Sequence, residues 1–276
     1  MTLNPSHPHL HPDWLLPQWP APNRVKAVCT TRSGGRSKAP WNDLNLGNHV
    51  GDDPTDVARN REVLQHGIGA RSVFMEQVHG SRMLAIDSTV DAAGAHDIPG
   101  HWVADGAVTQ QTGVACTVMV ADCLPVLLCD TQGLQVAIAH AGWRGLAGQG
   151  GSGILEEAVK CFWPLDPVPY TQNATKLIAW LGPCIGPKAF EVGEEVRIAF
   201  VSQNPQAAAC FEPVGRNTWL ADLPGLARLR LQVLGVVGIY GNDGSDGWCT
   251  VGNPSRFFSH RRDRISGRQA ACIWLE

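Results

Sequence analysis

The hydrophobic positions of this chain form short runs that are separated by glycine, proline and polar residues. Continuous runs of apolar and β-branched residues predict strands that are buried on both faces. These strands are expected at residues 25–31, 73–78, 114–120, 124–128, 134–139, 177–181, 236–240 and 269–275. Apolar residues that recur with the period of a helix predict helices at residues 54–65, 154–162, 191–200 and 223–234.

The order of these elements mixes strands and helices without a regular strand–helix–strand repeat. No internal repeat is visible, and the connections are too short for two independent domains. We therefore expect an α+β fold, in which one domain holds mixed β-sheets flanked by helices. This domain is expected to span residues 24–276, after an irregular, mobile arm at residues 1–23.

Composition narrows the possible classes of protein. Of the 276 residues, 44% are hydrophobic and only 17% are charged, which argues against long disorder or a coiled coil. The net charge of −3 gives the chain no global electrostatic reason to bind nucleic acid or an anionic membrane. No apolar run reaches the ~18 residues of a membrane span, and the N-terminal sequence lacks the pattern of a signal peptide.

The number and placement of the cysteines indicate the cellular compartment of the protein. The chain has nine cysteines, an odd number, and no CxxC motif, and most of them lie inside apolar runs. This pattern is typical of buried, reduced thiols rather than of a disulfide framework. We therefore expect a cytoplasmic protein.

Three segments place a residue that can bind metal at the end of a predicted strand. They are EQVHG, ADCLP and AHAGWRG, and they contribute His79, Cys123 and His140. Two imidazoles and a thiolate suit zinc, and three protein ligands are typical of a catalytic zinc site. Their separations along the chain match no short zinc motif, so the residues alone favour buried structural side chains over a zinc site.

Other features of the sequence are suited to binding an anion. Arg144 lies close to glycines in AHAGWRG, and the glycine-rich segment 148–153 precedes a predicted helix, where free backbone N–H groups can receive phosphate. The segment is neither a Walker motif nor a dinucleotide-binding fingerprint. Five arginines between residues 256 and 268 are typical of a solvated face, but Phe257 and Phe258 indicate that part of this run packs inward.

Taken together and in this order, several motifs resemble the laccase-domain family, also called the polyphenol oxidase or multicopper-oxidase-like family. The motifs are TTRSGG, LNLGNHVGDDP, EQVHG, ADCLPVLLCD, AHAGWRGLAG, AWLGPCIGP, FEVGEEVR and FFSHRRD. The resemblance covers residues 25–276, with small departures at Cys184 and His260. Bacterial members are described as purine nucleoside phosphorylases or as a peptidoglycan editing factor.

The resemblance implies a fold, a cofactor and an activity. The fold would be a layered α/β/β/α arrangement, related to the deamidase domain of a bacterial toxin. One Zn²⁺ ion would be bound by His79, Cys123 and His140, which would also be the catalytic residues. The activity would be phosphorolysis of adenosine, inosine, guanosine and methylthioadenosine, together with deamination of adenosine.

This activity defines the partners and further candidate residues. The partners would be purine nucleosides and phosphate, with no nucleic acid and no membrane, and the protein would be a monomer or a homodimer. Arg144 and Arg61 are expected to bind phosphate, because guanidinium groups pair well with phosphate oxygens. Asn45 is expected to hydrogen-bond the ribose or the base. Deamination also needs a carboxylate that transfers a proton, and Asp122 and Glu76 are the candidates nearest in sequence.

Three other functions stay open. A copper-dependent phenol oxidase needs many paired histidines, and the only such run is His7, His9 and His11 in the arm, although adventitious Cu²⁺ can occupy a three-ligand site. A cysteine hydrolase acting on peptidoglycan precursors would use Cys123 as the nucleophile and a histidine as the base. A binding protein with structural zinc would need a fourth ligand, which the sequence does not offer.

Overall fold

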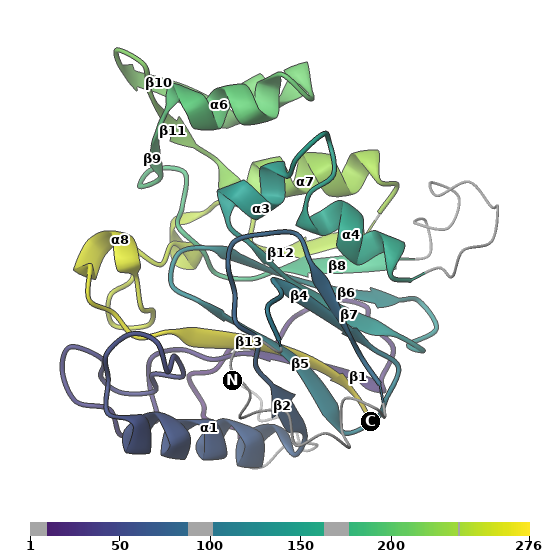
Figure 1. Cartoon of the computed structure of the whole chain (residues 1–276), viewed down its shortest axis with the longest axis vertical. Coiled ribbons are helices and arrows are strands. Elements are labelled where there is room, and N and C mark those ends of the chain that lie inside the picture. Colours follow the sequence, from purple (N-terminus) through teal and green to yellow (C-terminus); the bar gives the residue numbers. More distant parts are fainter. Residues whose placement is uncertain (1–9, 88–101, 163–176, 237) are drawn as a thin grey trace.

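The computed structural model describes residues 10–87, 102–162, 177–236 and 238–276 of the chain. Within these residues, two β-sheets pack face to face, and helices cover the outer face of each (Figure 1). This layered arrangement is a single α+β domain, as the sequence predicts.

The first sheet has four strands in the order β1-β13-β5-β2. Its strands are β1 (Val25–Cys29), β13 (Gln269–Leu275), β5 (Val114–Val120) and β2 (Arg71–Val73). Helix α1 (Pro54–Ile68) lies against its outer face, at the bottom of Figure 1. Asp53 caps this helix by accepting a hydrogen bond from the Thr55 amide, and Gly69 ends it in the left-handed conformation that favours glycine.

The second sheet has six strands in the order β12-β8-β6-β7-β4-β3. Its strands are β12 (Gly238–Gly241), β8 (Leu177–Leu181), β6 (Leu124–Asp130), β7 (Val136–Ala141), β4 (Gly106–Thr109) and β3 (Met83–Ile86). Its outer face is covered by α3 (Trp143–Ala147), α4 (Ile154–Lys160) and α7 (Leu223–Val233). None of the described helices is long and apolar enough to cross a membrane.

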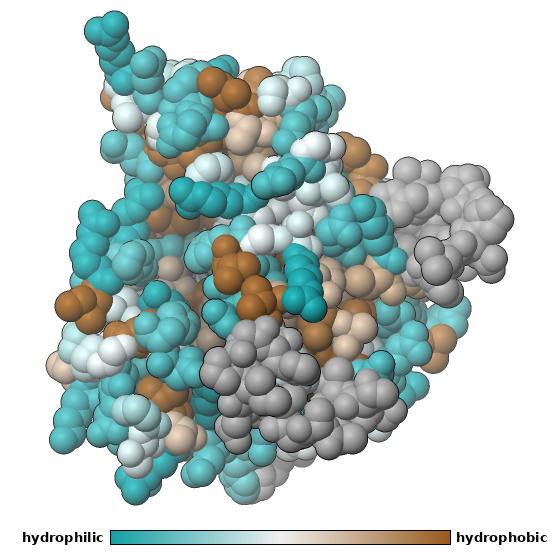
Figure 2. Space-filling view, in the orientation of Figure 1, coloured by the Kyte–Doolittle hydropathy of each residue, from teal (hydrophilic) through white to brown (hydrophobic). Residues whose placement is uncertain are grey.

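A smaller sheet and several short helices complete the described chain. The small sheet, at the top of Figure 1, contains β9 (Glu191–Gly193), β11 (Thr218–Ala221) and β10 (Phe211–Gly215) and packs against α6 (Glu194–Val201). The short helices are η2 (Pro205–Cys210), η3 (Asp246–Trp248) and α8 (His260–Asp263). Figure 2 shows the face of the molecule that is turned to the viewer in Figure 1. This face is mostly hydrophilic, with hydrophobic residues in small separate patches.

Burial on both faces explains why the strands read as continuous apolar runs. In β5, Cys116 and Val118 point between the two sheets, while Ala115 and Met119 pack in the layer under α1. The strands β6 and β7 alternate in the same way between the inter-sheet layer and the layer under α3, α4 and α7. Because side chains alternate along a strand, a strand with apolar layers on both sides needs apolar residues at every position.

Some elements differ from the sequence prediction. The strand expected at residues 73–78 ends at Val73, because only residues 71–73 pair with β5. The helix expected at residues 191–200 begins at Glu194, since the three residues before it pair with β11. The strands β3, β4, β10 and β11 were not predicted, and each has only four or five residues.

The described part of the predicted arm, residues 10–23, packs on the domain. Leu15 forms an isolated bridge with Cys29, and the Trp14 side chain is buried in the layer under α1. This part is irregular but does not hang free as a mobile tail. His7 and His9 lie outside the described residues.

Candidate metal and anion site

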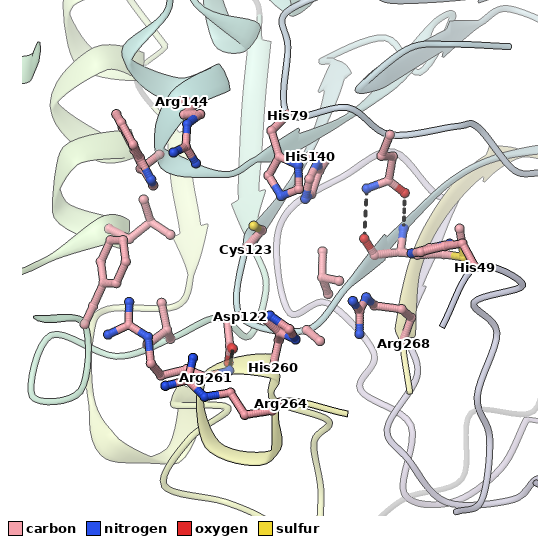
Figure 3. Close-up of a pocket in the computed structure, with 18 residues that line it drawn as sticks. His49, His79, Asp122, Cys123, His140, Arg144, His260, Arg261, Arg264 and Arg268 are labelled. Atoms are coloured by element: carbon pink, nitrogen blue, oxygen red, sulfur yellow. Dashed lines mark hydrogen bonds between the residues drawn. The ribbon is translucent and has the colours of Figure 1, made fainter. Parts of the chain in front are cut away.

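A cavity of about 360 Å³ lies where β5, β6 and β7 meet the loops around α3 and α8 (Figure 3). Cys123 enters it from the turn between β5 and β6, and His140 from the end of β7. His79 reaches it from the segment between β2 and β3. Three stretches of chain that are distant in sequence thus converge on one hollow.

His79, Cys123 and His140, here named the His–Cys–His group, lie together in this cavity. Their potential ligand atoms are all within 4.8 Å of one another, and the two imidazole rings meet edge to face. In the described residues this is the one group of three or more His, Cys, Asp or Glu side chains that is close enough to hold a metal ion. The structure therefore brings together the three residues that the motifs select.

Asp105 supports two members of the group, and sequence reasoning missed it. This fully buried carboxylate faces the His140 Nδ1 atom at 2.9 Å. It also accepts hydrogen bonds from the backbone amides of Val78, His79 and Gly80, at 3.2, 2.8 and 2.7 Å. A carboxylate behind a histidine fixes the tautomer and the orientation of the ring, which leaves His140 Nε2 as the atom for a metal ion.

The backbone turns sharply at two of the site segments. His79 has a φ angle of 62° and Asp122 one of 100°, in the region that glycine favours. Such conformations cost ~1–3 kcal/mol each and often occur at functional sites. At Asp122 the turn breaks the alternation of a strand, so both Asp122 and Cys123 line the cavity. In a regular strand these two neighbours would point to opposite faces.

Each oxygen of the Asp122 carboxylate accepts one hydrogen bond. Its Oδ1 atom accepts a hydrogen bond from the Thr250 hydroxyl at 2.6 Å, and its Oδ2 atom accepts one from the Arg261 amide at 2.7 Å. Glu76, the other candidate for proton transfer, is exposed and does not line the cavity. Asp122 is the one carboxylate among the lining residues, which all belong to the described chain.

The thiol and the imidazole of the group shift each other's titration. Burial alone raises the pKa of Cys123, but the charges and hydrogen bonds of His140 and His79 outweigh it and lower that pKa to about 6. Burial lowers the pKa of His140, but the Cys123 thiolate and the Asp105 carboxylate raise it to about 9. Near neutral pH the protein without metal therefore holds a thiolate–imidazolium pair.

A glycine gives the group its space. A Cβ atom on Gly142 would lie 2.9 Å from His79 Cδ2 and 3.0 Å from Cys123 Sγ, which is closer than a Cβ atom normally approaches. The donor set of two nitrogens and one sulfur matches zinc, and a carboxylate behind a ligating histidine is typical of zinc sites. The residues present thus fit a single zinc ion with three protein ligands.

The rest of the cavity is strongly cationic. Its lining includes four arginines, Arg144, Arg261, Arg264 and Arg268 (Figure 3). Three of them come from the C-terminal basic run, so part of this run lines the cavity, and Arg264 is at the same time exposed to solvent. In the same run Arg262 pairs with Asp263 and donates to backbone carbonyls. The arrangement suits an anion such as phosphate.

The structure places Asn45 and Arg61 outside the cavity lining. Asn45 is fully buried, and its Oδ1 atom accepts hydrogen bonds from the amides of Gly47 and Arg268. Arg61 donates to the Leu46 carbonyl and lies 4.0 Å from the Phe74 ring. Both residues therefore support the walls of the cavity, and direct contact of either with a substrate is not supported by their positions.

One wall of the cavity is apolar. Trp143, Ile185, Phe190 and Leu223 contribute to it. The Arg144 guanidinium lies 4.4 Å from the Trp143 ring, so a cationic group and an aromatic surface stand side by side. The cavity thus offers a metal-binding group, cations and an apolar surface that can hold a flat ring.

Comparison with known proteins identifies a family and relatives over nearly the whole chain. Residues 26–276 match a family model described as multi-copper polyphenol oxidoreductase laccase. A purine nucleoside phosphorylase of Pseudomonas aeruginosa is 44% identical over 264 residues, which cover 95% of this chain and 98% of the relative. The purine nucleoside phosphorylase YfiH of Escherichia coli is also 44% identical, with the same coverage over 263 residues.

Solved structures have the same fold. A protein of Neisseria meningitidis superposes with a TM-score of 0.83 and 44% identity, over 96% of this chain and 99% of that chain. The YlmD protein of Geobacillus stearothermophilus superposes with a TM-score of 0.81 and 32% identity, over 92% and 93%. The family model and these relatives extend over nearly the whole sequence, so the chain belongs to the multi-copper polyphenol oxidoreductase laccase family.

Proposed function

We propose that this chain is a zinc-dependent purine nucleoside phosphorylase, which acts on adenosine, inosine, guanosine and methylthioadenosine. The names of the relatives support this proposal. The observation that carries it is that the His–Cys–His group shares one cavity with four arginines. A phosphorylase needs both a group that activates the purine and a group that holds phosphate.

In the proposed reaction a phosphate oxygen forms a bond to C1′ of the ribose, and the bond from C1′ to the purine breaks. The purine leaves with the bonding electron pair and takes up a proton, so the products are the free base and the sugar 1-phosphate, which is ribose 1-phosphate, or methylthioribose 1-phosphate from methylthioadenosine. Zinc, when bound, supplies Lewis-acid chemistry that draws electron density from a purine placed against it. Arg144 holds the phosphate, and the apolar wall with Trp143 and Phe190 orients the base.

Asp105 acts on this chemistry through other residues. It holds the His140 ring and the backbone around His79, so it keeps the group assembled whether or not a substrate is present. When the side chains of a site are already in position, no binding free energy is needed to order them. Asp105 is therefore a positioning residue in this proposal.

Adenosine deamination is the second proposed activity. It replaces the amino group at C6 by an oxygen from water and releases ammonia, so a proton must move from the water to the leaving group. Asp122 is the carboxylate in the described lining of the cavity, and its Oδ1 atom can exchange its bond with Thr250 for one with the substrate. We assign the proton transfer to Asp122, because Glu76 faces solvent.

A cysteine hydrolase that acts on peptidoglycan precursors is the alternative that a specific observation favours. The lowered pKa of Cys123 beside a charged His140 is typical of a nucleophilic thiolate. A multicopper oxidase is a weaker alternative, because the described residues contain a single cluster of candidate ligands. Cytoplasmic location and a monomeric or homodimeric state are also parts of this proposal.

The test is the Cys123→Ala variant, with Cys161→Ala as the control for loss of a partly exposed thiol elsewhere. The variant should lose its bound zinc and its inosine phosphorolysis together, while the control keeps both. Chelation of the metal from the unmodified protein should also stop phosphorolysis. A Cys123→Ala protein that keeps its metal and its full turnover would contradict the proposal. Hydrolysis of a peptidoglycan precursor that survives chelation but not alkylation of the thiol would favour the hydrolase.

A further inference from the structure

The cavity holds more unpaired positive charge than one phosphate ion requires. Its four lining arginines face a single carboxylate, Asp122, whose two oxygens already accept hydrogen bonds from Thr250 and from the Arg261 amide. Within the described residues, none of the four guanidinium groups forms an ion pair with a carboxylate. Unpaired cations that converge on a hollow repel one another and favour bound anions.

These cations line different sides of the cavity. Arg144 extends from α3 on one side of Cys123, and Arg268 lies on the other side (Figure 3). Arg261 and Arg264 belong to α8 and its C-terminal end, and they line the edge of the cavity below Cys123 in the same view. We name Arg261 and Arg264, which lie three residues apart on α8 and its C-terminal end, the C-terminal arginine group.

Backbone contacts hold Arg261 and the segment that follows α8. Arg261 donates to the Glu191 carbonyl, and Arg268 donates to the carbonyls of Ser266 and Gly267. The Arg268 amide donates to the buried Asn45 side chain, so this segment is fixed to the loop before α1. Neutral carbonyl partners leave the positive charge of the guanidinium groups uncompensated, and a fixed position lowers the entropy cost of binding an anion.

We propose that the C-terminal arginine group is a second anion subsite, which binds the 5′-phosphoryl group of a purine nucleoside monophosphate. This inference rests on the proposed function, which places the base on the apolar wall and the attacking phosphate at Arg144. In a nucleoside, the 5′ carbon and the base lie on the same face of the ribose. The attacking phosphate approaches C1′ from the opposite face. A phosphoryl group on the 5′ carbon therefore reaches a cationic group other than Arg144.

The experiment measures equilibrium binding of inosine 5′-monophosphate, inosine and inorganic phosphate to the zinc-loaded protein by titration calorimetry. Because a charged phosphate makes strong hydrogen bonds with guanidinium, the monophosphate should bind about tenfold or more tightly than inosine. Arg264→Gln should reduce the affinity for the monophosphate about tenfold more than the affinity for inosine. Arg264 is exposed and makes no described side-chain hydrogen bond, so its replacement spares the fold.

Two further variants complete the test. Arg144→Gln should weaken the binding of inorganic phosphate more than the binding of the monophosphate. Arg256→Gln removes an exposed charge outside the cavity, so it should leave the affinities for the monophosphate, inosine and inorganic phosphate unchanged. The proposal is overturned if the monophosphate binds no more tightly than inosine, or if Arg264→Gln weakens inorganic phosphate and the monophosphate equally. These readouts need no turnover, so they stay separate from a failure of the phosphorylase proposal.

Discussion

Replacement of Asp105 by Asn is the sharpest single perturbation of the site. The carboxylate Oδ1 atom accepts the His79 amide and faces His140 Nδ1, while Oδ2 accepts the amides of Val78 and Gly80. Asparagine has the same shape but offers an oxygen at one position and an NH₂ group at the other. In either orientation the NH₂ group faces two of the four former donors, so two hydrogen bonds are lost.

The structure sets the size of the effect. A buried donor without an acceptor costs about 1–3 kcal/mol, so two lost bonds should lower the free energy of unfolding by about 2–6 kcal/mol. Loss of the carboxylate behind a ligating histidine should weaken zinc binding by about 10–100-fold. The stability is measured by urea unfolding of the protein without metal, and zinc affinity by competition with a chromophoric chelator. Asp246→Asn, an exposed surface change, is the control.

The pH dependence gives an independent check on the same residue. Burial raises the pKa of Asp105, but the hydrogen bond and charge of His140 and the backbone amides outweigh it and hold that pKa below its ordinary value of 3.8. The ionised carboxylate therefore contributes stability above about pH 4, and this contribution is lost as the pH falls through the lowered pKa. Asp105→Asn should remove that acid-side loss. Unchanged zinc affinity and an unchanged acid profile in the variant would refute the role given to Asp105.

Three further predictions concern the same cavity. In the protein without metal, iodoacetamide should alkylate Cys123 with a half-maximal rate near pH 6, because the neighbouring imidazoles lower its pKa to about 6; a midpoint near 9 would contradict the thiolate–imidazolium pair. Arg144→Lys should raise the KM for phosphate about tenfold or more, since a point charge replaces a planar fork, and an unchanged KM would remove Arg144 from the phosphate site. Gly142→Ala should reduce zinc content measured by metal analysis, because its Cβ would crowd His79 and Cys123; full occupancy would show that the site can adjust.

The central strands could be predicted from the sequence, and the edge elements could not. The strands β5, β8 and β13 have the predicted bounds, because layers on both sides make every position apolar. Strand β4 has only four residues and begins with glycine, so neither length nor periodicity marks it. The segment after Val73 is apolar as well, but it leaves the sheet, and pairing with a distant strand is not encoded in local pattern.

The candidate site was only partly visible in the sequence. The motifs select His79, Cys123 and His140, but nothing near residue 105 marks Asp105 as their support. It reaches His140 because β4 and β7 pair with Gly106 opposite Ala139, which places the preceding aspartate beside the histidine. Asn45 shows the opposite case, since this polar residue of the LNLGNHVGDDP motif serves the loop structure and not the ligand. The role of a residue that depends on strand register can be recognised only when the fold is known.

X-ray absorption spectroscopy of the zinc-loaded protein tests the central claim most directly, because it reports the ligands of the ion itself. The account predicts one zinc ion per chain, with one sulfur ligand at ~2.3 Å and two imidazole nitrogens at ~2.0–2.1 Å. The sulfur signal should disappear in Cys123→Ala. A zinc ion without a sulfur ligand, or one bound by several sulfurs, would contradict the account.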